Sequence, residues 1–165
     1  MTENMRLMFL TSRYFEQLKA IRGGSLVTDE RTRPIEFRCT SPIRPNDYQR
    51  VLYGNTLDSY IFVDLIGVPL VNATKESIDL VLVEDERFLA IRPSVGIPVI
   101  LLVPSSQDRE TTSVTLRAHP GFETESAAAQ SDSTFKGGID LLEPFERVRL
   151  ALEQAHAQKI GDKSK

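Results

Sequence analysis

The sequence predicts an α/β fold built on a mixed sheet. It would have an N-terminal antiparallel hairpin or meander, then helices, then two buried parallel strands, and finally a C-terminal amphipathic helix. Three patterns indicate this. Ile35, Phe37 and Cys39 alternate with polar residues, as in a strand with one buried face. The runs IDLVLVED (78–85) and IPVILLV (97–103) are continuously apolar, as in strands covered on both faces. A helical stripe of apolar residues runs through the last segment.

The N-terminal elements are expected to form a hairpin. The segment SLVTDE (25–30) is a second strand, joined to residues 35–40 by the polar, proline-bounded turn ERTRP. Residues 14–21 fit either a third strand or a short helix, because their apolar side chains also recur at helical spacing. The pair Gly23-Gly24 is expected to form a turn or a hinge.

Two helices are predicted next. Asn46 is a favourable N-cap, and Gln49 stands three residues later, which completes a capping box. Tyr48, Val51 and Leu52 form the apolar face of this first helix. A second helix is expected from Thr56, and Gly67 and Pro69 should end or kink it.

The two apolar runs are expected to be neighbouring parallel strands. The segment between them, residues 86–96, has room for a short helix only, which is near the minimum for a right-handed crossover.

At 165 residues the chain has the length of one domain with a sizeable core. We expect an α/β core at 1–103 and a polar loop or linker with an edge strand at 104–138. An amphipathic helix at 139–158 should pack on the core or on a partner, before a frayed tail at 159–165. The stripe of that helix consists of Leu141, Phe145, Val148 and Leu152.

Composition excludes several classes of protein. A net charge of −3 gives no global attraction to nucleic acid or to an anionic membrane. A single cysteine, Cys39, excludes an internal disulfide framework and a multi-cysteine zinc site. Glu3 and a short apolar run make the N-terminus a poor signal peptide, and no apolar run approaches the roughly 18 residues of a membrane span. These features predict a cytoplasmic protein.

Two groups of residues are candidates for a chemical role. Glu84, Asp85 and Glu86 follow a buried strand, at the edge where open α/β sheets place their ligands. If such carboxylates converged with others on two metal ions, Glu16, Asp29 and Asp85 would be the catalytic set, with Mg²⁺ or Mn²⁺ as cofactor. The second candidate is a basic and aromatic patch that could bind phosphate or an acidic surface. Its members are Arg31, Arg33, Arg44, Tyr48, Arg50 and Tyr53.

Several motifs resemble a pattern found in an uncharacterised bacterial protein family. They are Gly23-Gly24, LVTDE (26–30), PIEFR (34–38), Pro42, Arg44-Pro45, QRVLYG (49–54) and DLLEPFERVRLALE (140–153). The predicted order of elements is also similar to RNase H-like folds, in which a three-strand meander is followed by helix, strand, short helix and strand. Those nucleases carry an Asp in the middle of the first strand. Here Glu16 stands near the start of the strand predicted at 14–21.

These observations favour a non-catalytic cytoplasmic subunit or adaptor of a multiprotein assembly, without a metal or cofactor, bound to a protein partner or to a second copy. The alternative is a metal-dependent nuclease or nucleic-acid-processing enzyme of RNase H-like fold. A third hypothesis is a small-ligand sensor with its pocket near Glu84–Arg87.

Overall fold

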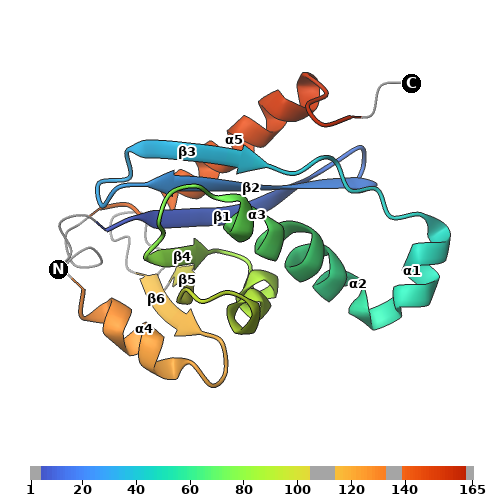
Figure 1. The fold of residues 1–165 in the computed structure, drawn as a ribbon. Coiled ribbons are helices and arrows are strands. Elements are labelled where there is room, and N and C mark those ends of the chain that lie inside the picture. Colours follow the sequence, from blue (N-terminus) through green and yellow to red (C-terminus); the bar gives the residue numbers. More distant parts are fainter. Residues whose placement is uncertain (1–4, 105–113, 133–138, 163–165) are drawn as a thin grey trace.

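The computed structural model describes residues 5–104, 114–132 and 139–162 (Figure 1). These residues form one six-stranded sheet in the order β3-β2-β1-β4-β5-β6. The strands are β1 (Leu7–Phe15), β2 (Ala20–Thr28), β3 (Pro34–Cys39), β4 (Leu80–Val83), β5 (Val99–Pro104) and β6 (Val114–Ala118).

The sheet is mixed, as the sequence predicts. Strands β1, β2 and β3 form an antiparallel meander. Strands β1, β4 and β5 run parallel, and β6 closes the edge antiparallel to β5. Because β6 joins the same sheet, residues after 103 also contribute to the core. Of the predicted linker, residues 105–113 and 133–138 lie outside the described residues.

The first strand lies earlier in the chain than predicted. The expected strand at 14–21 is wrong, because β1 covers Leu7–Phe15 and residues 16–19 form the turn into β2. Glu16, Gln17 and Leu18 all have positive φ, which is incompatible with an extended strand. The residues from Leu7 to Leu10 are fully buried, and this short apolar run pairs with β2 on one side and with β4 on the other.

Gly23 and Gly24 lie inside β2, so the predicted turn or hinge is wrong as well. A Cβ atom at Gly23 would stand 2.0 Å from Cγ2 of Ile66, on one face of the sheet. At Gly24 it would stand 2.8 Å from Cγ1 of Val148, which belongs to a helix on the other face. The two glycines therefore allow helices to approach both faces of the strand closely.

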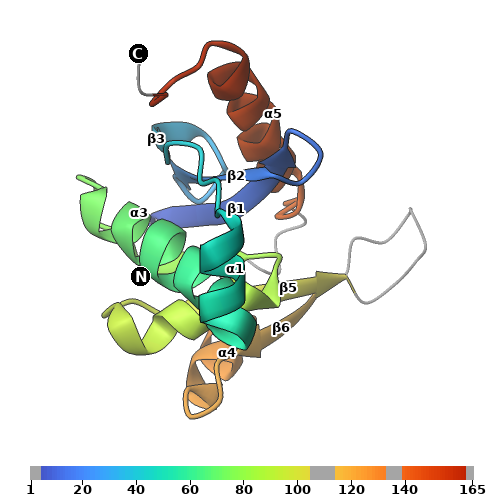
Figure 2. The same cartoon turned by 90° about the vertical axis from the view of Figure 1, so that its right-hand side faces the viewer.

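The helical segments pack on both faces of the sheet. They are α1 (Asp47–Tyr53), η1 (Gly54–Thr56), α2 (Leu57–Ser59), η2 (Tyr60–Gly67), α3 (Val68–Ala73), η3 (Glu86–Ser94), α4 (Glu123–Gln130) and α5 (Glu143–Ala157). Figure 2 shows α5 on one face of the sheet and α3 on the other.

The capping box of α1 is confirmed. The Asn46 side chain accepts a hydrogen bond from the Gln49 backbone N–H at 2.8 Å, and the Gln49 side chain accepts one from the Asn46 N–H at 2.9 Å. The predicted end or kink at Gly67 and Pro69 is different in the structure. There the π-helical η2 passes directly into α3, and Pro69 lies in the first turn of α3 without ending the run of helical segments.

The helical run from Asp47 to Ala73, although it changes direction at Gly54, is long and apolar enough, by length and composition alone, to cross a bilayer. Core helices pass the same test, and in its second half Ile61, Phe62 and Ile66 are buried against the sheet.

Two apolar clusters lie on opposite faces of the sheet. Met8 and Leu10 point towards η2, α3 and η3, whereas Leu7 and Phe9 point towards α5. The stripe predicted on the C-terminal helix packs in this second cluster, with Leu141, Phe145, Val148 and Leu152 at most 5% exposed. This stripe therefore contacts its own sheet and is not open to a partner.

Candidate functional site

The carboxyl ends of β1, β4 and β5 border a cavity of about 640 Å³. Strand β1 has β2 as its neighbour on one side and β4 on the other, and the chain turns from the end of β1 into β2, away from β4. This is a switch point, where open α/β sheets bind their ligands. The polar lining residues include Thr11, Tyr14, Glu84, Asp85, Arg87 and Arg117.

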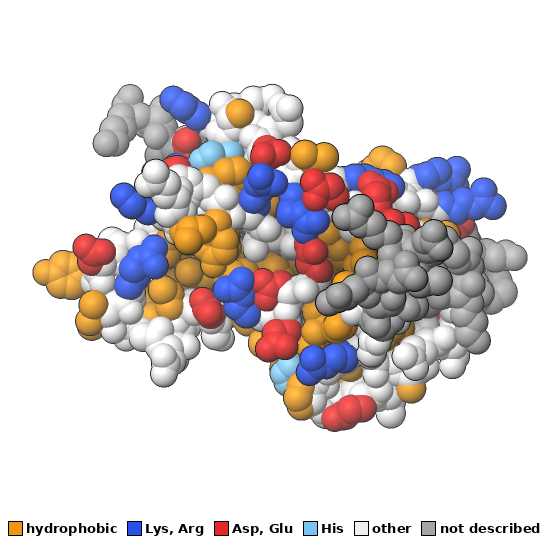
Figure 3. Space-filling view, turned by 180° about the vertical axis from the view of Figure 1, so that it is seen from behind, with side chains coloured by type: hydrophobic (Ala, Val, Ile, Leu, Met, Phe, Trp, Pro, Cys, Tyr) orange, Lys and Arg blue, Asp and Glu red, His pale blue; other side chains and the backbone are white. Residues whose placement is uncertain are grey.

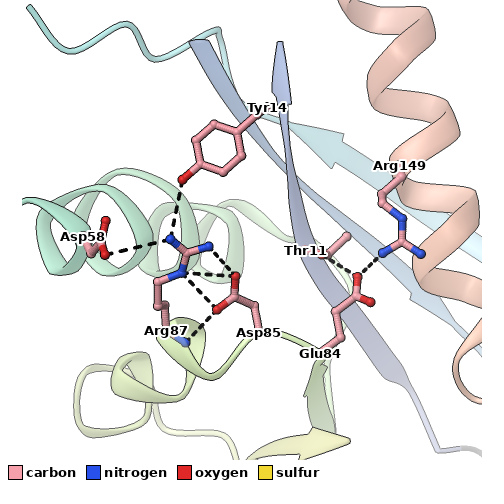
Figure 4. A network of polar contacts seen from close by, with 7 residues as sticks. All are labelled: Thr11, Tyr14, Asp58, Glu84, Asp85, Arg87 and Arg149. Atoms are coloured by element: carbon pink, nitrogen blue, oxygen red, sulfur yellow. Dashed lines mark hydrogen bonds and ion pairs between the residues drawn. The ribbon is translucent and has the colours of Figure 1, made fainter. Parts of the chain in front are cut away.

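Glu84 links β1 to α5 at this edge. Its carboxylate accepts a hydrogen bond from the Thr11 hydroxyl at 2.7 Å and forms an ion pair with Arg149 (Figure 4). Arg149 also donates to Glu146, at 2.9 and 3.1 Å. The side chains of Glu84 and Arg149 are 28% and 29% exposed, so the pair is only partly screened by solvent.

Asp85 is held by Arg87, two residues later. It caps η3 by accepting from the Arg87 backbone N–H at 3.0 Å, and it binds the Arg87 guanidinium at 2.7 Å. Burial raises the pKa of Asp85, but the hydrogen bonds and the charge of Arg87 outweigh it, so the pKa lies below its ordinary value. Asp85 is therefore ionised at neutral pH.

Arg87 is fixed from several directions. Its guanidinium lies 4.0 Å from the centre of the Phe62 ring, donates to the Tyr14 hydroxyl at 3.5 Å and stands 3.9 Å from Asp58 (Figure 4). The hydrogen bond to Asp85 raises the pKa of Arg87 most, against the effect of burial. The cavity wall is therefore a set of ion pairs anchored on β1, β4, α2 and α5.

The three predicted catalytic carboxylates do not come together. Asp29 follows β2 at the end where Thr28 pairs with Leu7, opposite the end that carries Asp85. At about 3.3 Å per residue, Asp29 and Asp85 lie about 20 Å apart along the sheet. Glu16 follows β1 at the Asp85 end, but it accepts hydrogen bonds from Arg44 at 2.7 and 3.0 Å and pairs with His156 at 3.0 Å.

Both other carboxylates have cationic partners of their own. Hydrogen bonding to Arg44 lowers the pKa of Glu16. Asp29 accepts hydrogen bonds from the backbone and side chain of Arg33, at 2.9 and 2.5 Å. In the three described ranges of the chain, no group of three or more His, Cys, Asp or Glu side chains could hold a metal ion.

The predicted basic and aromatic patch is divided in two. Arg31 and Arg33 lie in the turn before β3, whereas Arg44, Tyr48, Arg50 and Tyr53 lie after it. The six residues of β3 separate the two groups by about 20 Å. In the second group Tyr53 stacks on Tyr60, with ring centres 4.3 Å apart.

Helix α1 carries the most exposed apolar side chains of the described residues. Tyr48, Val51 and Leu52 are 80%, 78% and 79% exposed, and none of the residues of α1 is buried. Figure 1 shows α1 projecting beyond the end of the sheet, and hydrophobic side chains stand out at the corresponding left end of Figure 3. Between α1 and the core lies a small, largely apolar cavity of about 100 Å³, bordered by Ile43 and Leu57.

Sequence reasoning missed several of these positions. Thr11 and Arg149 gave no signal, because their roles depend on neighbours 73 and 65 residues away in the chain. Arg22 did have a signal in the sequence, because it is the only charged residue in the run AIRGGSLV. In the structure its side chain is fully buried.

The comparisons with known proteins are distant. No family model matches the chain, and no curated protein matches it. Among solved structures, endonuclease V of Bacillus subtilis aligns with a TM-score of 0.41 and 10% identity, over 64% of this chain and 46% of that one.

Two structures of Ciona intestinalis endonuclease V, each in complex with DNA containing an inosine followed by a ribo-adenosine, align with TM-scores of 0.44 and 0.43 and identities of 12% and 11%. Both alignments cover 82% of this chain, and 57% and 58% of the endonuclease chains. The chain thus spans about half the length of these proteins, and similarity of this size carries no inference about activity.

Proposed function

We propose that this protein is a non-catalytic cytoplasmic subunit or adaptor that binds a protein partner through the exposed face of α1. The observation that carries the proposal is the exposure of Tyr48, Val51 and Leu52, each between 78% and 80%, on one face of a projecting helix. Exposed groups of large apolar side chains mark interaction surfaces in soluble proteins.

The fold does not depend on this face. Helix α1 is fixed locally by the Asn46–Gln49 capping box and ends at Gly54, which has a φ of +52°. Since burying a side chain such as Leu or Val contributes about 1.5–3 kcal/mol, a partner that covered these residues would gain considerable binding free energy.

The spacing of the three residues suits a groove. Positions i, i+3 and i+4 of a helix lie side by side and insert together into an apolar channel of the partner. Charged side chains flank them, with Asp47 in the first turn and Arg50 in the last. The partner we expect is therefore a folded protein with an apolar groove.

The carboxylates at the strand ends already have cationic partners. Glu84 and Asp85 are each neutralised by an arginine, and such closed ion pairs fix side chains in place. A catalytic carboxylate would need to exchange its arginine for a metal ion or substrate during the reaction.

The proposal is tested by affinity capture from lysate of the native host, with and without nuclease treatment. The baits are the wild type, Leu52→Glu and a matched control, Ser59→Glu, which adds the same charge at an exposed position of α2. We expect the wild type and Ser59→Glu to capture one stoichiometric protein, independent of nuclease, and Leu52→Glu to lose it. Equal capture by all three baits would contradict a role for α1.

The metal-dependent nuclease is the second candidate, favoured by one observation. Glu84 and Asp85 border the 640 Å³ cavity beside β1, in a sheet whose first five strands follow the expected order. It predicts that Mg²⁺ or Mn²⁺ binds the wild type in calorimetry and supports DNA or RNA cleavage, and that Asp85→Asn abolishes both. Cleavage by the Asp85→Asn variant at the wild-type rate would show that this cavity is not the catalytic site.

A further inference from the structure

Arg22 is a fully buried cation near the start of β2, where it pairs with Arg13 of β1, and β1 separates it from β4 and the cavity of Glu84. Its Nε donates to Nδ1 of His156 at 2.9 Å, and its Nη1 donates to the backbone carbonyl of Thr40 at 3.1 Å. Its Nη2 has no hydrogen-bond partner within residues 5–104, 114–132 and 139–162. Since a buried unpaired donor is costly, this atom has an unmet requirement for an acceptor.

The acceptor nearest to this atom is a poor one. Asp162, in the turn after α5, places Oδ1 3.8 Å from Nη2 of Arg22 and 3.7 Å from Nη1 of Arg44. Ion-paired hydrogen bonds are normally about 2.7–2.9 Å long. This buried Oδ1 also has no hydrogen-bond partner in the described parts of the chain. Two guanidinium groups thus point at one carboxylate oxygen, and neither reaches it.

The remaining charges near this point are already paired. Glu16 accepts two hydrogen bonds from Arg44 and one from Nε2 of His156. Nδ1 of His156 accepts from Arg22, so the ring carries its proton on Nε2 and is neutral in this arrangement. Arg22 and Arg44 are therefore balanced by Glu16 and Asp162, and removing Asp162 leaves one positive charge uncompensated.

We propose that Arg22 and Arg44 form a binding site for a phosphate group, which Asp162 covers in the structure described here. A phosphate presents several oxygens at tetrahedral angles, so it can accept hydrogen bonds from both guanidinium groups, and arginine forks match phosphate geometry well. A carboxylate held at the end of a turn does not span the two.

The tail is seated closely enough to act as a cover. Gly161 has a φ of +75°, and a Cβ atom there would stand 2.6 Å from Oγ of Ser41. The last turn is held by a hydrogen bond from the Asp162 N–H to the Lys159 carbonyl at 3.1 Å. A ligand must displace this short turn, so phosphate should bind the wild type weakly and a variant without the Asp162 carboxylate more tightly.

The test is calorimetric titration of the full chain with inorganic phosphate, and with chloride at equal ionic strength. The variants are Asp162→Ala, Asp162→Ala combined with Arg44→Gln, and a control, Asp64→Ala, which removes an exposed negative charge elsewhere. We expect phosphate to bind Asp162→Ala at least about tenfold more tightly than the wild type. Asp64→Ala should match the wild type, and the double variant should lose the gain.

A second titration, with a nucleoside 5′-monophosphate, tells whether the site binds a phosphate ester or only the free phosphate ion. Binding of both ligands to Asp162→Ala indicates a phosphate-ester site, and binding of inorganic phosphate alone indicates a site for the free ion. Equal affinity of Asp162→Ala and Asp64→Ala, or a gain that survives Arg44→Gln in a folded double variant, would overturn the proposal. Because α1 contributes nothing to this site, the outcome is independent of partner binding.

Discussion

Helices α1 and α5 have the same kind of amphipathic sequence and opposite environments. In α5 the apolar residues Phe145, Val148 and Leu152 are fully buried against β1 and β2. In α1 the apolar residues Tyr48 and Leu52 are about 80% exposed, and nothing in the described part of the chain covers them. Amphipathic periodicity thus identifies the apolar face of a helix but does not identify what packs on it.

The difference arises from length and from the neighbouring chain. The stripe of α5 extends over 15 residues and meets β2 at Gly24, where the missing side chain admits Val148 and Leu152. Helix α1 has only seven residues and begins after Pro45, beyond Ile43, which still pairs with Ile21 of β2. We interpret the buried face as a requirement for folding and the exposed face as a requirement for binding.

The largest effect is expected at the centre of the buried face. Phe145→Ala removes a fully buried ring that packs edge-to-face on Phe9, with ring centres 5.3 Å apart. We expect it to lower the free energy of unfolding by about 3–5 kcal/mol, measured by urea denaturation followed by circular dichroism. A loss below about 1 kcal/mol would show that α5 does not depend on this contact.

The close approach of α5 to the sheet is tested next. Gly24→Ala places a Cβ atom 2.8 Å from Cγ1 of Val148 and 3.0 Å from Cδ2 of Leu152, so the helix must shift outwards. We expect a destabilisation of about 1–3 kcal/mol in the same assay. Gly96→Ala is the control, because a Cβ atom there meets nothing within 4 Å. Equal stability of the two variants would contradict the packing described for β2.

Loss of the capping box should have a smaller effect on stability, because α1 is held by local contacts. Asn46→Ala removes the side chain that accepts from the Gln49 N–H at 2.8 Å. The loss of an N-cap costs about 0.5–2 kcal/mol of helix stability. Because α1 is not part of the core, we expect this cost as faster amide hydrogen exchange within α1, with little change in the global unfolding midpoint.

The smallest effect on stability is expected on the exposed face itself. Leu52→Ala should change the free energy of unfolding by less than about 0.5 kcal/mol, because the side chain is 79% exposed. Denaturation of the purified variant gives this value directly. A loss comparable to that of Phe145→Ala would mean that Leu52 is buried in solution, by this chain or by a second copy.

Local patterns predicted much of the fold. Alternation at 35–39 corresponds to β3, but the predicted buried face is wrong, because Ile35 and Phe37 are both 39% exposed. The apolar runs at 78–85 and 97–103 contain β4 and β5, and the Asn46–Gln49 capping box is observed. The first strand was misplaced, because helical spacing at 14–21 obscured a turn with three positive φ values. The glycine pair was misread since its reason, close contact with Ile66 and Val148, is visible only in three dimensions.

The candidate site was less predictable than the fold. The strand-end position of Glu84 and Asp85 followed from the sequence, but their arginine partners did not. Arg87 is a sequence neighbour of Asp85, whereas Arg149 reaches Glu84 from α5, 65 residues away. The basic patch failed for a related reason, since the sequence does not show that β3 separates Arg33 from Arg44.

Amide hydrogen exchange of the full chain, free and bound to its captured partner, tests the contrast between α1 and α5 most directly. We predict that residues 47–53 exchange more slowly in the complex, while residues 143–157, already protected by the sheet, exchange at the same rate in both states. A complex in which residues 47–53 stay unprotected while another surface becomes protected would contradict the binding role of α1.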